Sequence, residues 1–101
     1  MTAPAGLPTP AGNSVLVIDD HPLFRKGVSQ LLALDPQLRL AGEASSGEEG
    51  LRLALECDPD LILLDLNMKG MGGLETLARL REAGCDGRIV MLTVSDVADN
   101  L

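Results

Sequence analysis

Residues 60–75 read DLILLDLNMKGMGGLE, and this stretch decides the fold. The run Leu61–Asp65 is apolar until it ends in an acid, which predicts a strand buried on both faces, as in a parallel sheet. A glycine-rich loop, Asn67–Gly73, leads into the amphipathic stretch Leu74–Ala83, and Gly84 is a fitting terminator for a helix there. The side chains expected to face inward from this helix are Leu74, Leu77 and Ala78. The segment therefore predicts one strand–loop–helix unit of an α/β fold.

The same unit recurs on both sides of this segment. Short apolar runs predict strands at Ser14–Asp19, Leu38–Ala44 and Arg88–Thr93. Helical spacing predicts helices over His21–Leu34 and from Ser46 to about Cys57. Their expected inward side chains are Phe24, Val28, Leu31 and Leu32 in the first helix, and Leu51, Ala54 and Leu55 in the second. The order β-α-β-α-β-α-β, with another helix beginning after it, predicts a parallel sheet with right-handed crossovers and helices on both faces.

The predicted helices carry start and stop signals. Pro22 suits the first turn of the first helix, and Asp35-Pro36 stops that helix. Ser46 and Glu49 match a capping box, in which Ser46 is the N-cap and Glu49 reaches back. The candidate caps for the helix after the fourth strand are Ser95 and, as the alternative, Asp96.

Length and composition fit one small, soluble domain. The chain has 101 residues, 46% of them hydrophobic, and a single aromatic residue, so its core must be aliphatic. No apolar run approaches the roughly 18 residues that a membrane span needs. The net charge of −7 argues against nucleic-acid binding by this segment, because such binding needs clustered Lys and Arg. The same charge suits a bound cation or a basic partner surface.

Two cysteines and one histidine are too few for a structural zinc site. Cys57 and Cys85 lie far apart without a CxxC motif, and the sole histidine, His21, cannot complete a four-ligand set. We expect both thiols to be reduced, as in a cytosolic protein. Residues 1–13 hold three prolines, no charged side chain and no signal-peptide pattern. We expect a disordered tail there and a domain over residues 14–101.

Polar side chains end three of the four predicted strands. Asp19 and Asp20 end the first, Asp65 ends the third and Thr93 ends the fourth, so all four should converge beyond the carboxyl edge of the sheet. Three close carboxylates repel one another unless a cation lies among them, and Mg²⁺ prefers such oxygen ligands. The backbone carbonyl of Asn67 could complete the coordination. The alternative is that these acids face water, or that Asp20 caps the first helix.

Three segments resemble the signature segments of response-regulator receiver domains, particularly those of the NarL/FixJ type. They are VLVIDDHP (15–22), DLILLDLNMKGMGGLE (60–75) and RIVMLT (88–93). Together with GEASSGEEG (42–50), they are most similar to nitrate/nitrite response regulators of the NarL type. The similarity runs from about residue 14 to residue 101. It implies a flavodoxin-like (CheY-like), doubly wound parallel sheet of strand order 2-1-3-4, with a fifth strand and helix that this chain stops before.

The resemblance also implies the chemistry of the acidic edge. Asp65 would accept a phosphoryl group from a sensor histidine kinase and become an acyl phosphate. Asp20 and Asp65 would ligate Mg²⁺ directly, Asp19 would act largely through water, and the Asn67 carbonyl would bind the metal. The hydroxyl of Thr93 would hydrogen-bond the phosphoryl oxygens. The parent protein would be a cytoplasmic transcription regulator. Its DNA binding would belong to an output domain that is not part of residues 14–101.

The sequence departs from the family pattern at two places. Met68-Lys69-Gly70 stands where the family usually has a proline, and we interpret Lys69 as a solvated loop charge, with control of access to Asp65 as the alternative. The family's lysine at the end of the fifth strand is absent, so this segment is expected to phosphorylate poorly. The fourth strand would then have an unpaired edge that invites self-association. We assign His21 a packing role at the helix start, against the alternatives of general base and metal ligand.

Two other functions compete with the phosphorylation switch. A Mg²⁺-dependent phosphatase of the haloacid-dehalogenase kind also uses an aspartate nucleophile, but it needs an acid two residues later, where this chain has Asn67. This argues against an enzyme. A degenerate receiver, acting through protein contacts without phosphorylation, is the second alternative, although Asp65 and Thr93 are both present.

Overall fold

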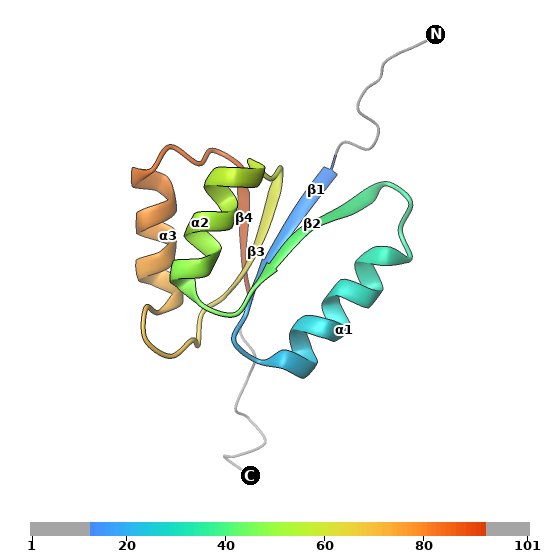
Figure 1. Cartoon of the computed structure of the whole chain (residues 1–101), viewed down its shortest axis with the longest axis horizontal. Coiled ribbons are helices and arrows are strands. Elements are labelled where there is room, and N and C mark those ends of the chain that lie inside the picture. Colours follow the sequence, from blue (N-terminus) through green and yellow to red (C-terminus); the bar gives the residue numbers. More distant parts are fainter. Residues whose placement is uncertain (1–12, 93–101) are drawn as a thin grey trace, which may run out of the picture.

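A computed structural model describes residues 13–92 of the chain as a parallel sheet with helices on both faces (Figure 1). Its elements are β1 (Asn13–Ile18), α1 (Pro22–Ala33), β2 (Leu38–Ala44), α2 (Gly47–Cys57), β3 (Leu61–Asp65), α3 (Gly73–Glu82) and β4 (Arg88–Leu92). The predicted order of these seven elements is confirmed, and their boundaries differ from the predicted ones by at most one residue. The expected N-terminal tail covered residues 1–13, but Asn13 is the first residue of β1. Residues 1–12, together with Thr93, Ser95 and Asp96, lie outside the described residues.

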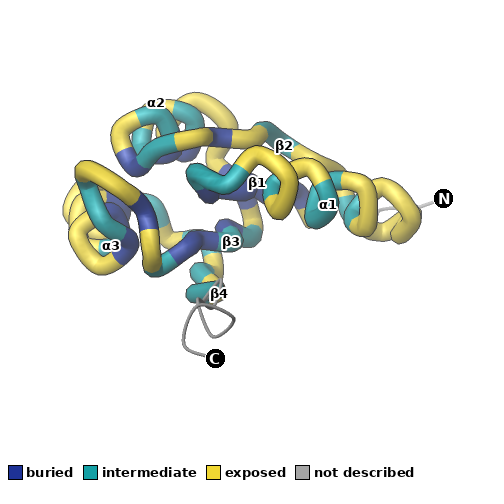
Figure 2. Tube along the Cα trace, turned by 90° about the horizontal axis from the view of Figure 1, so that it is seen from below, coloured by how far each residue is buried: buried dark blue, intermediate teal, exposed yellow. Residues whose placement is uncertain are grey.

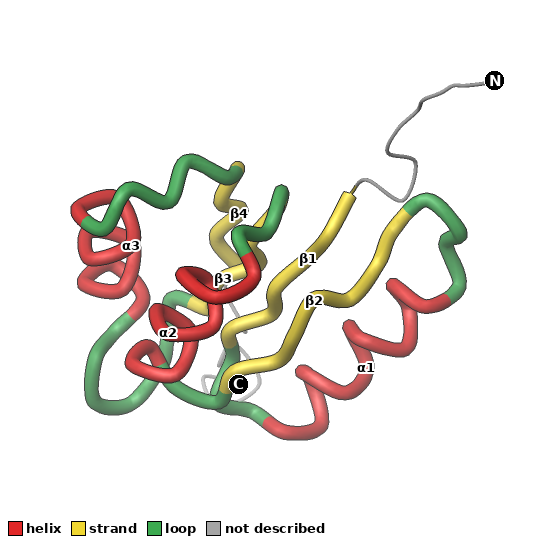
Figure 3. Tube along the Cα trace, turned by 45° about the horizontal axis from the view of Figure 1, so that its top comes forward, coloured by secondary structure: helices red, strands yellow, loops and turns green. Residues whose placement is uncertain are grey.

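The strands pair in the order β2-β1-β3-β4, as the resemblance implied. All three pairings are parallel, and Ile18 lies opposite Ala44 on one side and Leu64 on the other. The register between β1 and β2 shifts by one residue between Val15 and Leu16. Helix α1 lies on one face of the sheet, while α2 and α3 lie side by side on the other (Figure 3). The central strands β1 and β3 therefore carry their carboxyl ends to the middle of one edge.

The core is aliphatic and centres on β1 and β3, whose inner residues are buried in Figure 2. It consists of Leu16, Ile18, Ala44, Ala54, Ile62, Leu64, Met68 and Leu80. Residues Val15 and Val17 are fully buried on the face that α1 partly covers. This burial on both faces explains why β1 reads as a continuous apolar run. No helix within residues 13–92 has the length and apolar character to span a membrane.

The helix faces predicted from sequence are partly wrong. Leu55 is 57% exposed and Leu74 is 70% exposed, and Ala78 is also exposed. On α2 the face toward the sheet is set by Gly50 and Ala54, because Gly50 lies directly against the Ile18 side chain. The buried residues of α3 are Gly73, Thr76 and Leu80, with Leu77 packed against the core as predicted. In α1, Phe24 and Leu31 are exposed, whereas Val28 and Leu32 are half-buried.

Gly50 and Gly73 lie where a larger residue does not fit unless its neighbours move. A Cβ on Gly50 would be 2.5 Å from Ile18 Cδ1, and a Cβ on Gly73 would be 2.5 Å from the Asp65 backbone oxygen. Gly50 therefore lets α2 approach β1, and Gly73 lets α3 begin against the end of β3. Gly84 has a φ of +90° just beyond α3, which confirms its predicted role as a helix terminator.

The N-terminal signals of α1 and α2 are confirmed. Pro22 occupies the first position of α1, and the Ser46 hydroxyl accepts a hydrogen bond from the Glu49 amide at 3.1 Å. The Glu49 carboxylate reaches back one residue further than expected, since it accepts from the Ser45 amide at 2.8 Å and the Ser45 hydroxyl at 3.1 Å. These two hydrogen bonds lower the pKa of Glu49 below its usual 4.5, and the bond from the Ser45 amide has the larger effect.

Replacing Glu49 with glutamine tests this cap. We expect the variant to lose about 0.5–1 kcal/mol of unfolding free energy at neutral pH, the usual size of a capping contribution. Because the folded-state pKa is lowered, the advantage of the carboxylate is present above pH 4.5 and is lost as the pH falls through that lowered value. Denaturant unfolding of the wild type and the variant at pH 7 and near pH 3 measures the difference in their unfolding free energies. A difference between the proteins that is just as large at the acid pH would contradict the assignment.

Candidate metal centre

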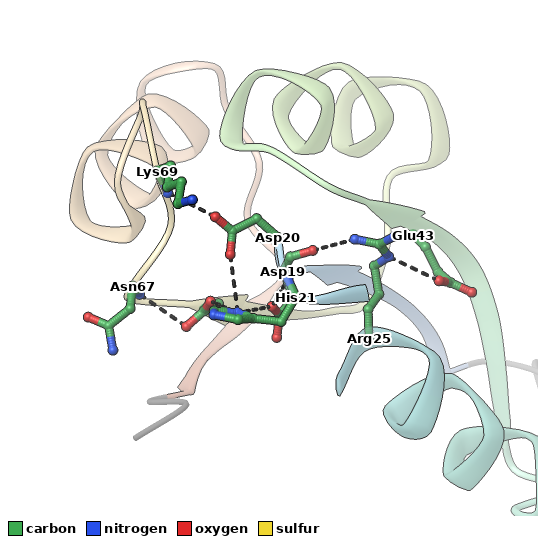
Figure 4. Close-up of polar contacts among 8 residues, drawn as sticks. Asp19, Asp20, His21, Arg25, Glu43, Asn67 and Lys69 are labelled. Carbon is green, nitrogen blue, oxygen red and sulfur yellow. Dashed lines mark hydrogen bonds and ion pairs between the residues drawn. The ribbon is translucent and has the colours of Figure 1, made fainter. Parts of the chain in front are cut away.

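The acidic residues predicted to converge do lie together at the carboxyl edge of the sheet (Figure 4). Asp65 is the last residue of β3, and Asp19 follows β1 directly. Because β1 and β3 are paired and parallel, their ends place these two carboxylates beside each other. Asp19 is 1% exposed and Asp65 is fully buried, while the Asp20 side chain is 18% exposed. Two of the three acids are therefore held out of water, where charge is costly.

Each of the three acids keeps one buried oxygen without a hydrogen-bond partner. These atoms are Asp19 Oδ2, Asp20 Oδ1 and Asp65 Oδ2. Burial, followed by the nearby charges of Asp19 and Asp20, raises the pKa of Asp65, while a hydrogen bond from the Asn67 amide opposes this rise. Buried oxygens without donors are expensive unless a cation supplies the missing interaction. The ligand atoms offered by the cluster lie within 4.8 Å of one another, so the residues fit a bound divalent cation.

His21 contributes its ring to the same cluster. Its Nδ1 lies 2.9 Å from Asp19 Oδ1, 3.1 Å from Asp20 Oδ1 and 3.2 Å from Asp65 Oδ2. The hydrogen bond to Asp19 is the main cause that raises the pKa of His21. The predicted position at the helix start is confirmed, because His21 is the N-cap of α1. A packing role alone does not describe the ring, which lies among the acids because the His21 amide also donates to Asp19 Oδ1, at 2.8 Å.

Asp20 does not cap the first helix, which was the alternative considered from sequence. Its Oδ2 accepts a hydrogen bond at 2.9 Å from the backbone amide of Lys69, 49 residues away. A proline at position 69 could not donate this bond, because proline has no backbone N–H. The backbone of Lys69 therefore joins the loop after β3 to the end of β1. From sequence, only the side chain of Lys69 was considered, and this role of its backbone was not predicted.

Arg25 supports the site, and sequence reasoning did not single it out. Its guanidinium donates to the backbone oxygen of Asp19 at 2.7 Å and lies 3.3 Å from a carboxylate oxygen of Glu43 in β2. This one side chain thus ties α1 to the ends of β1 and β2. The only sequence signal was a basic residue one turn after the acidic pair, which is too common to identify a function.

An open pocket of about 440 Å³ gives access to the cluster. It is lined by Asp20, His21, Ser45, Asn67 and Lys69. The Asn67 amide donates to Asp65 Oδ1 at 3.0 Å, so the loop fixes the orientation of that carboxylate. The metal-binding role of the Asn67 carbonyl stays a prediction, and Thr93 lies outside the described residues.

Comparison with known proteins agrees with this arrangement. Residues 15–101 match the family described as "Response regulator receiver domain". The nitrate/nitrite response regulator NarL of Escherichia coli K12 is 58% identical over 83 residues, covering 82% of this chain and 38% of that protein. A homologous regulator of Haemophilus influenzae is 53% identical over 87 residues, covering 86% of this chain and 42% of that protein. The chain thus spans about two fifths of the length of these relatives.

A solved structure shows the same architecture. The receiver domain of the NarL regulator of Mycobacterium tuberculosis superposes with a TM-score of 0.78 at 38% identity, covering 84% of this chain and 68% of that one. The resemblance to NarL-type regulators that the sequence carried is therefore confirmed. The chain belongs to the response regulator receiver domain family, within the group of receivers related to NarL.

Proposed function

We propose that this domain is a phosphorylation switch in which Asp65 accepts a phosphoryl group from the phosphohistidine of a sensor kinase. The observation that carries the proposal is a buried carboxylate whose Oδ2 has no hydrogen-bond partner and faces two further acids. A buried, oriented and unpaired carboxylate is a stronger nucleophile than a solvated one, because no water must be removed before attack. The Asn67 amide at 3.0 Å holds that carboxylate in place.

In the transfer, a carboxylate oxygen of Asp65 bonds to phosphorus as the bond from phosphorus to the kinase histidine nitrogen breaks. The product is an acyl phosphate on Asp65 and a histidine on the kinase whose nitrogen is free to take up a proton. Asp19, Asp20, Asp65 and the Asn67 carbonyl would hold Mg²⁺, which neutralises charge on the transferring group. Arg25 keeps Asp19 in position through its backbone oxygen. The Thr93 hydroxyl would then hydrogen-bond the phosphoryl oxygens.

The role of the switch follows from the relatives. We propose that the parent protein is a cytoplasmic transcription regulator, possessing a DNA-binding output domain outside these residues and responding to nitrate or nitrite. Phosphorylation adds about −1.5 to −2 charges to an edge that is already acidic, and this local change would favour a second conformation. Self-association through β4, which pairs only with β3 within residues 13–92, would be one readout.

Intact mass spectrometry after incubation with acetyl phosphate tests the proposal. We expect one phosphoryl group to be added when Mg²⁺ is present, at the low yield predicted from sequence for this segment, and none when Mg²⁺ is chelated. An Asp65→Asn variant is expected to show no addition at all, since its amide cannot form the acyl phosphate. Asp86→Asn is the matched control, because Asp86 is exposed at the opposite end of β4. Phosphorylation of the Asp65→Asn variant, or its loss in the control, would contradict the assignment.

A further inference from the structure

The phosphoryl transfer described above makes no use of the His21 imidazole, although the ring lies inside the acidic cluster (Figure 4). Its Nδ1 is within 3.2 Å of an oxygen from each of the three acids. The single proton on Nδ1 makes a hydrogen bond to Asp19 only, since Asp20 Oδ1 and Asp65 Oδ2 remain without hydrogen-bond partners. The ring is therefore within ion-pair distance of all three carboxylates and lies inside the cluster.

The spacing of these atoms matches a coordination sphere. Neighbouring ligands of an octahedral ion with bonds of about 2.1 Å lie about 3.0 Å apart, since that separation is √2 times the bond length. The distances from Nδ1 to the three oxygens are 2.9, 3.1 and 3.2 Å. These separations equal those expected between neighbouring ligands, so the nitrogen is close enough to the carboxylate oxygens to share one ion with them.

The ring is also held in this place. The His21 amide donates to Asp19 Oδ1 at 2.8 Å, and Pro22 follows as the first residue of α1. The backbone that carries the imidazole is therefore tied to one of the acids it faces. Asp19 and Asp65, at 1% and 0% exposure, each turn an unpartnered oxygen into the same space. These buried oxygens without hydrogen-bond partners are a second observation that points to a ligand in this space.

We infer that His21 is a metal ligand that shifts the selectivity of this site toward borderline first-row cations such as Co²⁺ and Ni²⁺, relative to Mg²⁺. Imidazole nitrogen binds these ions well, whereas Mg²⁺ prefers oxygen ligands and retains water. On binding, the imidazolium form of His21 releases its Nδ1 proton to solvent, which leaves a neutral ring with its hydrogen on Nε2 and a lone pair on Nδ1 for the metal. This inference rests on the proposed function in one respect, namely that the cluster binds a divalent cation.

Titration calorimetry with Co²⁺ and Mg²⁺ separately, on the wild-type chain and on His21→Phe, tests the inference. Both are made in a Cys57→Ser, Cys85→Ala background, so that thiols do not bind cobalt. Phenylalanine keeps a planar ring and removes both nitrogens, and the side chain it replaces is 43% exposed, so the fold is expected to persist. We expect Co²⁺ affinity to fall at least about tenfold, a size typical of losing a group that supports a metal, and Mg²⁺ affinity to change much less.

Electron spin-echo spectroscopy of bound Mn²⁺ adds a direct readout. Since His21 is the sole histidine of the chain, a nitrogen coupling of the imidazole type can come from no other residue. We expect this coupling in the wild-type chain and not in His21→Phe. Its absence from the wild type would overturn the inference.

These experiments distinguish a failure of the proposed function from a failure of the inference about His21 alone. If neither cation binds the wild-type chain, the proposed function fails together with the inference. If Mg²⁺ binds and His21→Phe leaves Co²⁺ affinity unchanged, or lowers both affinities equally, only the inference fails. If His21→Phe binds Mg²⁺ more tightly than the wild type, the ring competes with the metal instead of binding it, and the inference is again wrong.

Discussion

Replacing Gly73 with alanine is expected to lower the unfolding free energy by about 2–4 kcal/mol, a large share of the stability of a domain of this size. The added Cβ would lie 2.5 Å from the Asp65 backbone oxygen and 2.6 Å from Leu66 Cα. Both are backbone atoms, so no side-chain rotation can relieve the contact. The start of α3 or the end of β3 must move, and the Asp65 carboxylate must move with it.

Denaturant unfolding measures the stability change, and phosphorylation by acetyl phosphate measures the effect on Asp65. Gly27→Ala is the matched control, because Gly27 lies within α1 and a Cβ there would meet nothing within 4 Å. There the same methyl group should stabilise the helix by about 0.5–1 kcal/mol. If the two glycine variants changed stability in the same direction, the close approach of α3 to β3 would not be what constrains residue 73.

Replacing Asp65 with asparagine is expected to stabilise the chain in metal-free buffer at pH 7, by on the order of 1–3 kcal/mol. The wild-type carboxylate is buried beside Asp19 and Asp20, and the burial and these charges raise its pKa, which means that the fold disfavours its ionised form. Asparagine has nearly the same shape and no charge. Thermal unfolding in the presence of a chelator measures the difference.

Added Mg²⁺ should reverse the order of the two proteins. A cation that binds only the folded wild type raises its free energy of unfolding by mass action. At cation concentrations well above the dissociation constant, this gain grows with the logarithm of the concentration. The Asp65→Asn variant, lacking one ligand, should gain much less. Asp86→Asn is again the control, and its stability should match that of the wild type both without metal and with Mg²⁺. An Asp65→Asn variant that is less stable than wild type without metal would show that repulsion at the site is not the dominant cost.

The strands could be predicted closely because their burial leaves a simple pattern. β3 reads LILLD, apolar up to the acid that leaves the sheet, and its predicted bounds are those observed. The buried faces of the helices were harder to predict from the sequence. Leu74 and Leu55 were expected inside because they are large and apolar, yet close contact at Gly50 and Gly73 turns other residues inward. Helical spacing defines a face only approximately, and packing against a specific strand decides which side is buried.

The acids of the site were predictable, whereas the groups that organise them were not. Asp19, Asp20 and Asp65 follow strands, and strand ends meet in a parallel sheet. The Lys69 amide acts through its backbone, which every residue except proline possesses, so its side-chain identity gave no signal. The orientation of His21 depends on where the segment after β1 meets the end of β3 in space. Interactions of this kind are set by tertiary structure.

The tight glycines also bear on how this sequence can diverge. Gly47, at the start of α2, has no more room than Gly50 and Gly73, since a Cβ there would be 2.3 Å from Thr76 Oγ1. Loops and helix starts usually tolerate substitution well. In this domain, positions 47, 50 and 73 should instead be about as intolerant of change as the leucines of the core. We therefore expect substitutions to accumulate at outward helix positions such as Leu55 and Leu74. The side chains there are exposed, so a substitution changes the free energy of unfolding little.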